Sequence, residues 1–268
     1  MQQQVNQDVK QRNCITVHKT QGRPVVFGHG FGCDQLIWLP VLSQLPDNVA
    51  PITFDYVGCG RSDFGAYDKE KYASFNGYVQ DLIDVIEALN LGAIDYVGHS
   101  VSGMIGMLAA IERPDLFKQI IAIGPSPKYL NDTDYEGGFE REDIIDLLSM
   151  MERNHFEWAG YLAPIVMENS QRPELAEQLR KSFANSNPEI SRRFAEVLFL
   201  SDNREYLERV PVPVTLMYCA VDVIVPVSVI EYMATQIPQC DLVELNAAGH
   251  YPHVSAPQEV SQAIMANL

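Results

Sequence analysis

One serine stands in a setting that could make it a nucleophile. The segment Gly98-His99-Ser100-Val101-Ser102 follows a short apolar run that ends at Val97 and precedes a helical pattern that starts near Met104. Small residues at such a strand-to-helix turn let the backbone bend sharply and expose the serine hydroxyl, an arrangement called a nucleophile elbow. The common motif has glycine where Ser102 stands, so the match is close but incomplete. We predict Ser100 as the nucleophile.

A serine hydroxyl becomes a good nucleophile when a base removes its proton. His250 ends the segment Ala247-Ala248-Gly249-His250, which follows the last predicted strand and precedes the final helix. This position lies at the carboxyl edge of the sheet. His253 is the alternative base, and otherwise it would be a surface histidine of the same loop. We expect His250 to be the base.

An imidazole base needs a carboxylate that fixes its tautomer and stabilises its cation. Asp222 follows the predicted strand 214–218 and precedes a predicted helix. Asp241 competes for this role, but it stands at the start of a strand and therefore at the opposite end of the sheet. The chain order Ser100, Asp222, His250 is typical of α/β-hydrolases.

A tetrahedral oxyanion needs a pair of backbone N–H donors. The segment Gly28-His29-Gly30-Phe31-Gly32 follows the predicted strand 24–27, and a glycine-rich turn there can point its amides inward. The N–H groups of Phe31 and Val101 are the predicted pair. The glycines do not form a Gly-x-Gly-x-x-Gly segment, and no Walker lysine follows them, so a nucleotide site is disfavoured.

These residues are distant in sequence, and the elements between them must bring them together. Amphipathic repeats predict helices over 78–89, 104–112 and 230–236. Short apolar runs predict strands between them, and the alternation indicates a mostly parallel, doubly wound sheet with helices on both faces, as in the α/β-hydrolase fold. The predicted strands are 14–20, 24–27, 51–54, 94–97, 120–123, 214–218 and 242–245.

The segment 127–203 breaks this alternation. It has no convincing strand and shows successive amphipathic helical patterns. We expect a single domain, 1–268, whose core covers about 1–126 and 204–268 and carries an inserted helical cap at about 127–203. Inserted segments over strand ends often become lids, although this one could also be a helical excursion without a role in substrate choice.

An apolar substrate pocket is expected between the sheet and the cap. The candidate lining residues are aromatic: Phe31 from the glycine-rich loop, and Phe139, Trp158 and Phe194 from the cap. The alternative is that these aromatic side chains only pack the interior of the cap.

The composition disfavours several partner classes. The 268 residues carry a formal net charge of −16, and no basic stripe is present, so nucleic acid is not an expected partner. Residues 1–10 lack the regions of a signal peptide, and no apolar run is long enough to span a membrane, which predicts a cytoplasmic protein. The five scattered cysteines form no Cys-x-x-Cys pair, and neither metal nor cofactor is expected.

Several segments together resemble one family of α/β-hydrolases: the RsbQ-like proteins of bacterial stress signalling, to which the chain is most similar, and the karrikin and strigolactone receptors of plants. The segments are 29–35, 54–60, 98–102, 124–127 and, in the cap, 135–140. The resemblance implies a four-helix lid over a hydrophobic pocket and a triad at Ser100, His250 and Asp222. It also implies slow hydrolysis or sensing of a small apolar ligand.

Two functions are compatible with these residues. The first is a serine hydrolase of the carboxylesterase type that acts on a small hydrophobic ester or lactone-like ligand. The second is a signalling protein that senses such a ligand and binds a regulatory phosphatase or kinase, with only slow hydrolysis. A dehalogenase or an epoxide hydrolase would need aspartate in place of Ser100.

Overall fold

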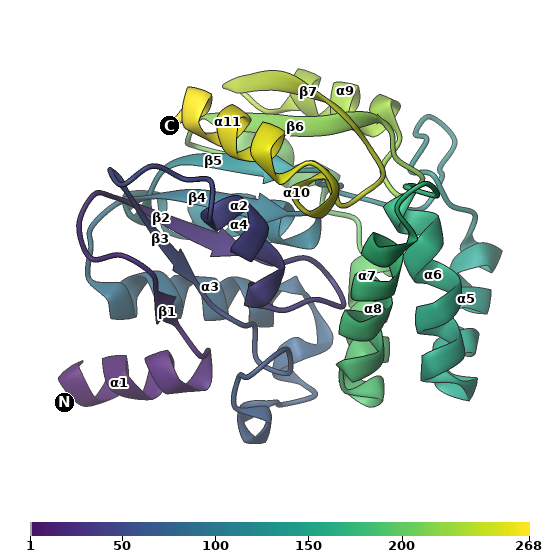
Figure 1. The fold of residues 1–268 in the computed structure, drawn as a ribbon, viewed down its shortest axis with the longest axis horizontal. Helices are drawn as coiled ribbons and strands as arrows, with labels where there is room; N and C mark the ends of the chain where they lie inside the picture. Colours follow the sequence, from purple (N-terminus) through teal and green to yellow (C-terminus); the bar gives the residue numbers. More distant parts are fainter. Residues whose placement is uncertain (1) are drawn as a thin grey trace.

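The computed structural model describes the backbone of residues 2–268 and the side chains of residues 7–268. Its centre is a seven-stranded sheet with the strand order β1-β3-β2-β4-β5-β6-β7 (Figure 1). Within this sheet β1 and β3 are antiparallel and the other neighbours are parallel. The strands are β1 Thr16–Val17, β2 Arg23–Gly28, β3 Val49–Thr53, β4 Ile94–His99, β5 Phe117–Ile123, β6 Val214–Val221 and β7 Cys240–Ala248.

The central strands are buried on both faces. Val25, Val26 and Phe27 of β2 are fully buried, because a continuous apolar run lies between two layers of helices. Helix α3 packs with α1 and α4, and α2 packs with α10 and α11 (Figure 1). The bounds are α1 Gln2–Arg12, α2 Leu39–Leu42, α3 Phe75–Leu89, α4 Val101–Glu112, α9 Val227–Gln236, α10 Pro252–Ser255 and α11 Pro257–Asn267.

Four helices between β5 and β6 form the cap, and Figure 1 shows them grouped beside the sheet. The side chains of Asn154 and Asn187 accept hydrogen bonds from the first turns of the second and fourth of these helices, and proline opens the third and the fourth. The local sequence therefore marks where these helices begin. They are α5 Arg141–Arg153, α6 His155–Met167, α7 Pro173–Asn185 and α8 Pro188–Leu200.

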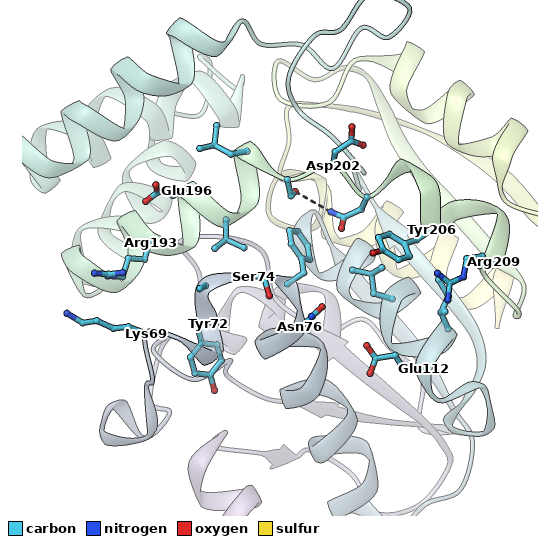
Figure 2. A pocket seen from close by; sticks show the side chains of 18 residues that line it. Lys69, Tyr72, Ser74, Asn76, Glu112, Arg193, Glu196, Asp202, Tyr206 and Arg209 are labelled. Carbon is cyan, nitrogen blue, oxygen red and sulfur yellow. Dashed lines mark hydrogen bonds between the residues drawn. The ribbon is translucent and has the colours of Figure 1, made fainter.

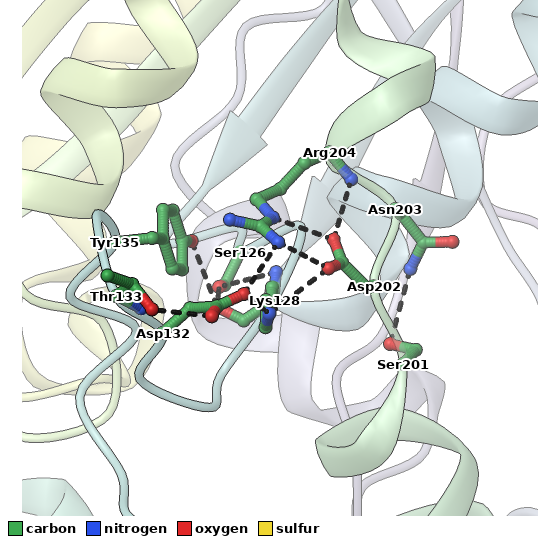
Figure 3. Close-up of polar contacts among 9 residues, drawn as sticks. All are labelled: Ser126, Lys128, Asp132, Thr133, Tyr135, Ser201, Asp202, Asn203 and Arg204. Atoms are coloured by element: carbon green, nitrogen blue, oxygen red, sulfur yellow. Dashed lines mark hydrogen bonds and ion pairs between the residues drawn. The ribbon is translucent and has the colours of Figure 1, made fainter.

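The two ends of the cap segment meet at a charged joint. Lys128, at the entry, and Arg204, just after the exit, each pair with both Asp132 and Asp202 at distances between 2.6 and 3.1 Å (Figure 3). The side chain of Lys128 is largely buried there. The cap thus leaves and rejoins the core at one place.

The predicted α/β-hydrolase architecture is confirmed, with differences in the first 20 residues. Strand β1 has two residues in place of the predicted seven, and α1 was not predicted because its residues are mostly polar and weakly patterned. Among the described helices, none combines the length and apolar character needed to cross a bilayer.

Candidate active site

Ser100 occupies a strained turn between β4 and α4. Its φ of 54° and ψ of −122° fall in a region that costs a non-glycine residue roughly 1–3 kcal/mol. The turn is held by hydrogen bonds from Ser100 N–H to the Ile123 carbonyl oxygen (2.8 Å) and from Gly103 N–H to the Ser100 carbonyl oxygen (2.9 Å). A Cβ at Gly98 would lie 2.6 Å from the Ser102 carbonyl carbon. These are the features of a nucleophile elbow.

The parallel strands bring Ser100, His250 and Asp222 to one edge of the sheet. His250 Nε2 lies 2.8 Å from Ser100 Oγ, and His250 Nδ1 lies 2.8 Å from Asp222 Oδ2. Asp222 Oδ1 also accepts hydrogen bonds from the amides of Ile224 (2.8 Å) and Val225 (3.2 Å), which orient the carboxylate. All three side chains are buried. The arrangement can pass a proton from a serine to an imidazole whose cation faces a carboxylate.

The competing residues have other surroundings. Asp241 is exposed near the amino end of β7, the end of the sheet opposite Ser100. His253 is fully buried and not at the surface, with its ring centroid 4.7 Å from that of Trp38 and 4.2 Å from that of His99. Its two ring nitrogens make no hydrogen bond to the described residues. Burial, with a smaller effect of His250, lowers the pKa of His253 to about 3.

The two predicted oxyanion donors are buried amides without a partner. Val101 is the first residue of α4, directly after Ser100, and Phe31 lies in the loop after β2. Within the described part of the chain, neither N–H donates a hydrogen bond. Buried unpaired amides are rare in folded proteins. Two of them near a serine hydroxyl, one at a helix N-terminus, suit a developing negative charge.

The hydroxyl of Ser102 supports these donors, a role that the motif alone did not reveal. It donates to the carbonyl oxygen of His29, in the loop that carries Phe31, and lies 3.1 Å from the Tyr56 hydroxyl. The Tyr56 hydroxyl is in turn 3.2 Å from that of Tyr96. This buried network joins the loop after β2 to the first turn of α4. A glycine at position 102, as in the common motif, could not make these contacts.

A small void adjoins Ser100. Its volume of about 20 Å³ admits a water molecule but falls far below the roughly 300–1,000 Å³ of small-molecule sites. Its wall is mainly apolar and comes from the core and the cap together. Tyr129 adds a hydroxyl that is buried and unpartnered among the described residues. Burial raises the pKa of Tyr129, so the phenol keeps its proton and can donate a hydrogen bond.

Of the four aromatic residues predicted to line the pocket, the structure places Phe31 in the wall of the void and the other three behind it. The ring centroids of Trp158 and Phe194 lie 6.0 and 5.7 Å from that of Phe31, and Phe139 packs on another wall residue, Phe199, at 5.9 Å. Helical periodicity identifies the inward face of the cap but not which side chain reaches furthest. The cap residues in the wall are Tyr129, Leu162, Val166, Phe183, Leu198 and Phe199.

Larger grooves lie outside this void, and two of them border helix α8. One, of about 260 Å³, runs between the loop after β2 and helices α7 and α8, and Phe31 lines both this groove and the void. The other, of about 850 Å³, lies between α3, α4 and α8, where Lys69, Glu112 and Arg193 surround it (Figure 2). It shares no lining residue with the void. The first groove is therefore the one of these two that shares a wall residue with the void.

Comparison with known proteins places this site in a family. The family model described as "Alpha/beta hydrolase family" matches residues 25–263. The chain belongs to the α/β-hydrolase family. Among curated α/β-hydrolases, the karrikin insensitive 2 receptor CA of Petunia hybrida is 34% identical over 97% of each chain. The strigolactone esterase RMS3 of Pisum sativum is 36% identical over 93% of this chain and 94% of its own.

A solved α/β-hydrolase structure is also similar along the whole chain. A hydrolase from Oleispira antarctica has a TM-score of 0.95 and is 36% identical, covering 98% of this chain and 96% of its own. The resemblance seen in the sequence is thereby confirmed, on the side of the plant receptors and esterases. Within the described residues, no group of three or more His, Cys, Asp and Glu could hold a metal ion.

Proposed function

We propose that this α/β-hydrolase hydrolyses the ester bond of a small hydrophobic ester or lactone-like ligand. The observation that carries the proposal is the pair of 2.8 Å contacts that join Ser100 to His250 and His250 to Asp222. Ser100 Oγ attacks the carbonyl carbon while His250 takes its proton, and the N–H groups of Phe31 and Val101 stabilise the oxyanion. His250 then protonates the leaving oxygen, and water releases the acyl group by the same steps.

The proposed ligand class follows from the walls of the site. The void is mainly apolar, with the Tyr129 hydroxyl as a further donor for a ligand oxygen. A ligand larger than a water molecule requires the cap to move, and the groove that shares Phe31 with the void marks the seam where it can open. In this proposal the cap acts as a lid that admits the ligand and excludes water during the reaction.

Replacement of the nucleophile tests this proposal. We expect Ser100→Ala to lower kcat on short p-nitrophenyl esters by up to about 10⁶-fold, because the triad acts as a unit. Ser149→Ala, on α5 of the cap, serves as the matched control and should retain activity. Thermal unfolding of both variants checks that the fold is intact. Wild-type activity in folded Ser100→Ala would refute the assignment.

A second function, sensing with slow hydrolysis, is favoured by two observations. The void is far smaller than a ligand, so in this alternative each turnover requires a movement of the cap. Similar proteins over nearly the whole chain include one named as a receptor as well as one named as an esterase. In this alternative, the ligand-dependent state of the cap is read by a regulatory phosphatase or kinase.

A further inference from the structure

The turn between α6 and α7 lies against the loop that carries His250 (Figure 1). We call residues 166–172 the cap turn and residues 248–255 the histidine loop. The N–H of His250 donates to the carbonyl oxygen of Val166, in the cap turn, at 2.8 Å. The carbonyl oxygen of His250 lies 2.7 Å from Nε2 of His99, the residue before the nucleophile. The backbone of the base is therefore held from the cap on one side and from the core on the other.

Two cap-turn side chains add further contacts. Asn169 Nδ2 donates to the carbonyl oxygens of Met167 (2.6 Å) and Ala248 (3.1 Å), and so joins the cap turn to the start of the histidine loop. The Arg172 guanidinium donates to the carbonyl oxygen of Ser255 at 2.7 Å, at the end of the same loop, and also to Asn169 Oδ1. The two side chains thus link the cap turn to both ends of the histidine loop.

The backbones of the cap turn and the histidine loop approach each other as closely as glycine allows. Gly249 has a φ of +89°, and a Cβ there would lie 2.3 Å from the Met167 carbonyl oxygen. Beside it, Glu168 adopts a left-handed conformation with φ 49°. Burial and the nearby carboxylate of Asp222 raise the pKa of Glu168. The cap turn and the histidine loop are therefore in direct backbone contact at Gly249.

Fewer hydrogen bonds join the cap to the loop after β2, on the other side of the site. Among the described residues, one hydrogen bond joins helix α7 to the loop after β2, from Ser182 Oγ to the Gly32 carbonyl oxygen at 3.0 Å. The groove of about 260 Å³ runs along this seam. The cap turn is therefore the part of the cap with the denser hydrogen bonding to the loops of the site.

We infer that the cap turn positions the catalytic base, and that Asn169 is a positioning residue that acts through the histidine loop on His250. This inference rests on the proposed roles of Ser100 and His250. It gives the cap a second task besides enclosing the ligand, because the turn keeps the imidazole in line with Ser100 while the rest of the cap moves. A misplacement of about 1 Å at such a group can cost about 10²-fold in rate.

Asn169→Ala tests the inference, with Asn187→Ala as the control. Asn187→Ala removes the side chain that accepts a hydrogen bond from the first turn of α8, and this side chain contacts no residue of the histidine loop. We expect Asn169→Ala to lower kcat on a short p-nitrophenyl ester about tenfold, with KM changed less than about twofold, because it disturbs the base and not the ligand wall. In protein labelled with ¹³C-histidine, the ring signal of His250 should shift or broaden. Asn187→Ala should leave both kcat and this signal unchanged.

The inference is overturned if Asn169→Ala leaves the His250 signal and kcat unchanged, or if Asn187→Ala alters both to the same extent. Should Asn169→Ala fail to fold, Arg172→Met removes the contact with Ser255 and is read by the same two measurements. A wild-type protein without ester hydrolysis would refute the proposed function. The ring signal of His250 needs no substrate, so it still decides whether Asn169 positions the imidazole.

Discussion

His250 and His253 are three residues apart, yet their surroundings give them opposite properties. Both ring nitrogens of His250 have partners, the serine hydroxyl and the Asp222 carboxylate. His253 lies between Trp38 and His99, and burial keeps its pKa near 3. A neutral, unpartnered ring in this position contributes packing and cannot exchange protons with a ligand at physiological pH.

The buried His253 makes stability depend on pH. The unfolded chain binds a proton at this residue near its ordinary pKa of 6.5, whereas the folded chain binds it only near 3. The unfolded state therefore holds more protons between these values, and the free energy of unfolding falls as pH drops from 6.5, by up to about 1.4 kcal/mol per pH unit. We expect His253→Gln to flatten this dependence, measured by urea unfolding between pH 7 and pH 4.

The same variant checks the choice of base. His253→Gln should keep most of the ester hydrolysis at pH 7, whereas His250→Gln should lose it. If the free energy of unfolding depends on pH equally steeply in the wild type and in His253→Gln, His253 is not the buried neutral group described above. His99, whose pKa burial also lowers, contributes in the same direction and remains in both proteins.

Helix α6 has one face toward the void and one face toward solvent. Leu162 and Val166 line the void beside Ser100, whereas Tyr161 and Ile165 are exposed on the outer face. Under the proposed function, the inner face limits the size of the ligand, and the sensing alternative assigns the outer face to a partner.

Truncation on the inner face should widen the choice of ester. We expect Leu162→Ala to raise the ratio of kcat/KM for p-nitrophenyl butyrate over acetate by at least about tenfold, because butyrate has two more methylene groups and each is worth about tenfold or more in an apolar pocket. Ile165→Ala, a similar truncation on the outer face, should leave the ratio unchanged. Equal ratios in wild type and Leu162→Ala would show that this wall does not contact the acyl chain.

The sequence predicts the central strands and the positions of the triad residues, because both depend on local residue pattern and on the direction of the strands. The buried run 25–27 has the composition of a central strand, and the strand ends place Ser100, Asp222 and His250 at one edge of a parallel sheet. The sequence does not predict which cap residues line the void, because the distance that the side chain of Trp158 or Phe194 extends toward Ser100 depends on the angles between helices. The bond from His250 N–H to a backbone carbonyl of the cap turn has no side-chain signature at all.

At the scale of the whole molecule, the cap has an inner side that faces the void and an outer side that faces solvent. Its inner side forms part of the wall of the void, and its outer side exposes large apolar side chains on α5 and α6. These are Ile145, Phe156, Tyr161 and Ile165, of which Phe156 is 68% exposed. Contiguous patches of such side chains mark interaction sites, whereas single exposed residues do not. If ligand binding shifts the cap, the affinities for ligand and partner change by the same factor.

The sensing alternative therefore predicts a ligand-dependent partner on the outer face of α5 and α6. A pull-down from native lysate with Ser100→Ala, which cannot consume an ester ligand, should recover a signalling phosphatase or kinase. Adding Ile145→Lys and Phe156→Lys should reduce recovery at least about tenfold, because buried charges without partners weaken an interface. Leu242→Lys, an exposed leucine of β7, is the matched control and should bind normally. Recovery of no such protein under any ligand condition would leave hydrolysis as the sole proposed function.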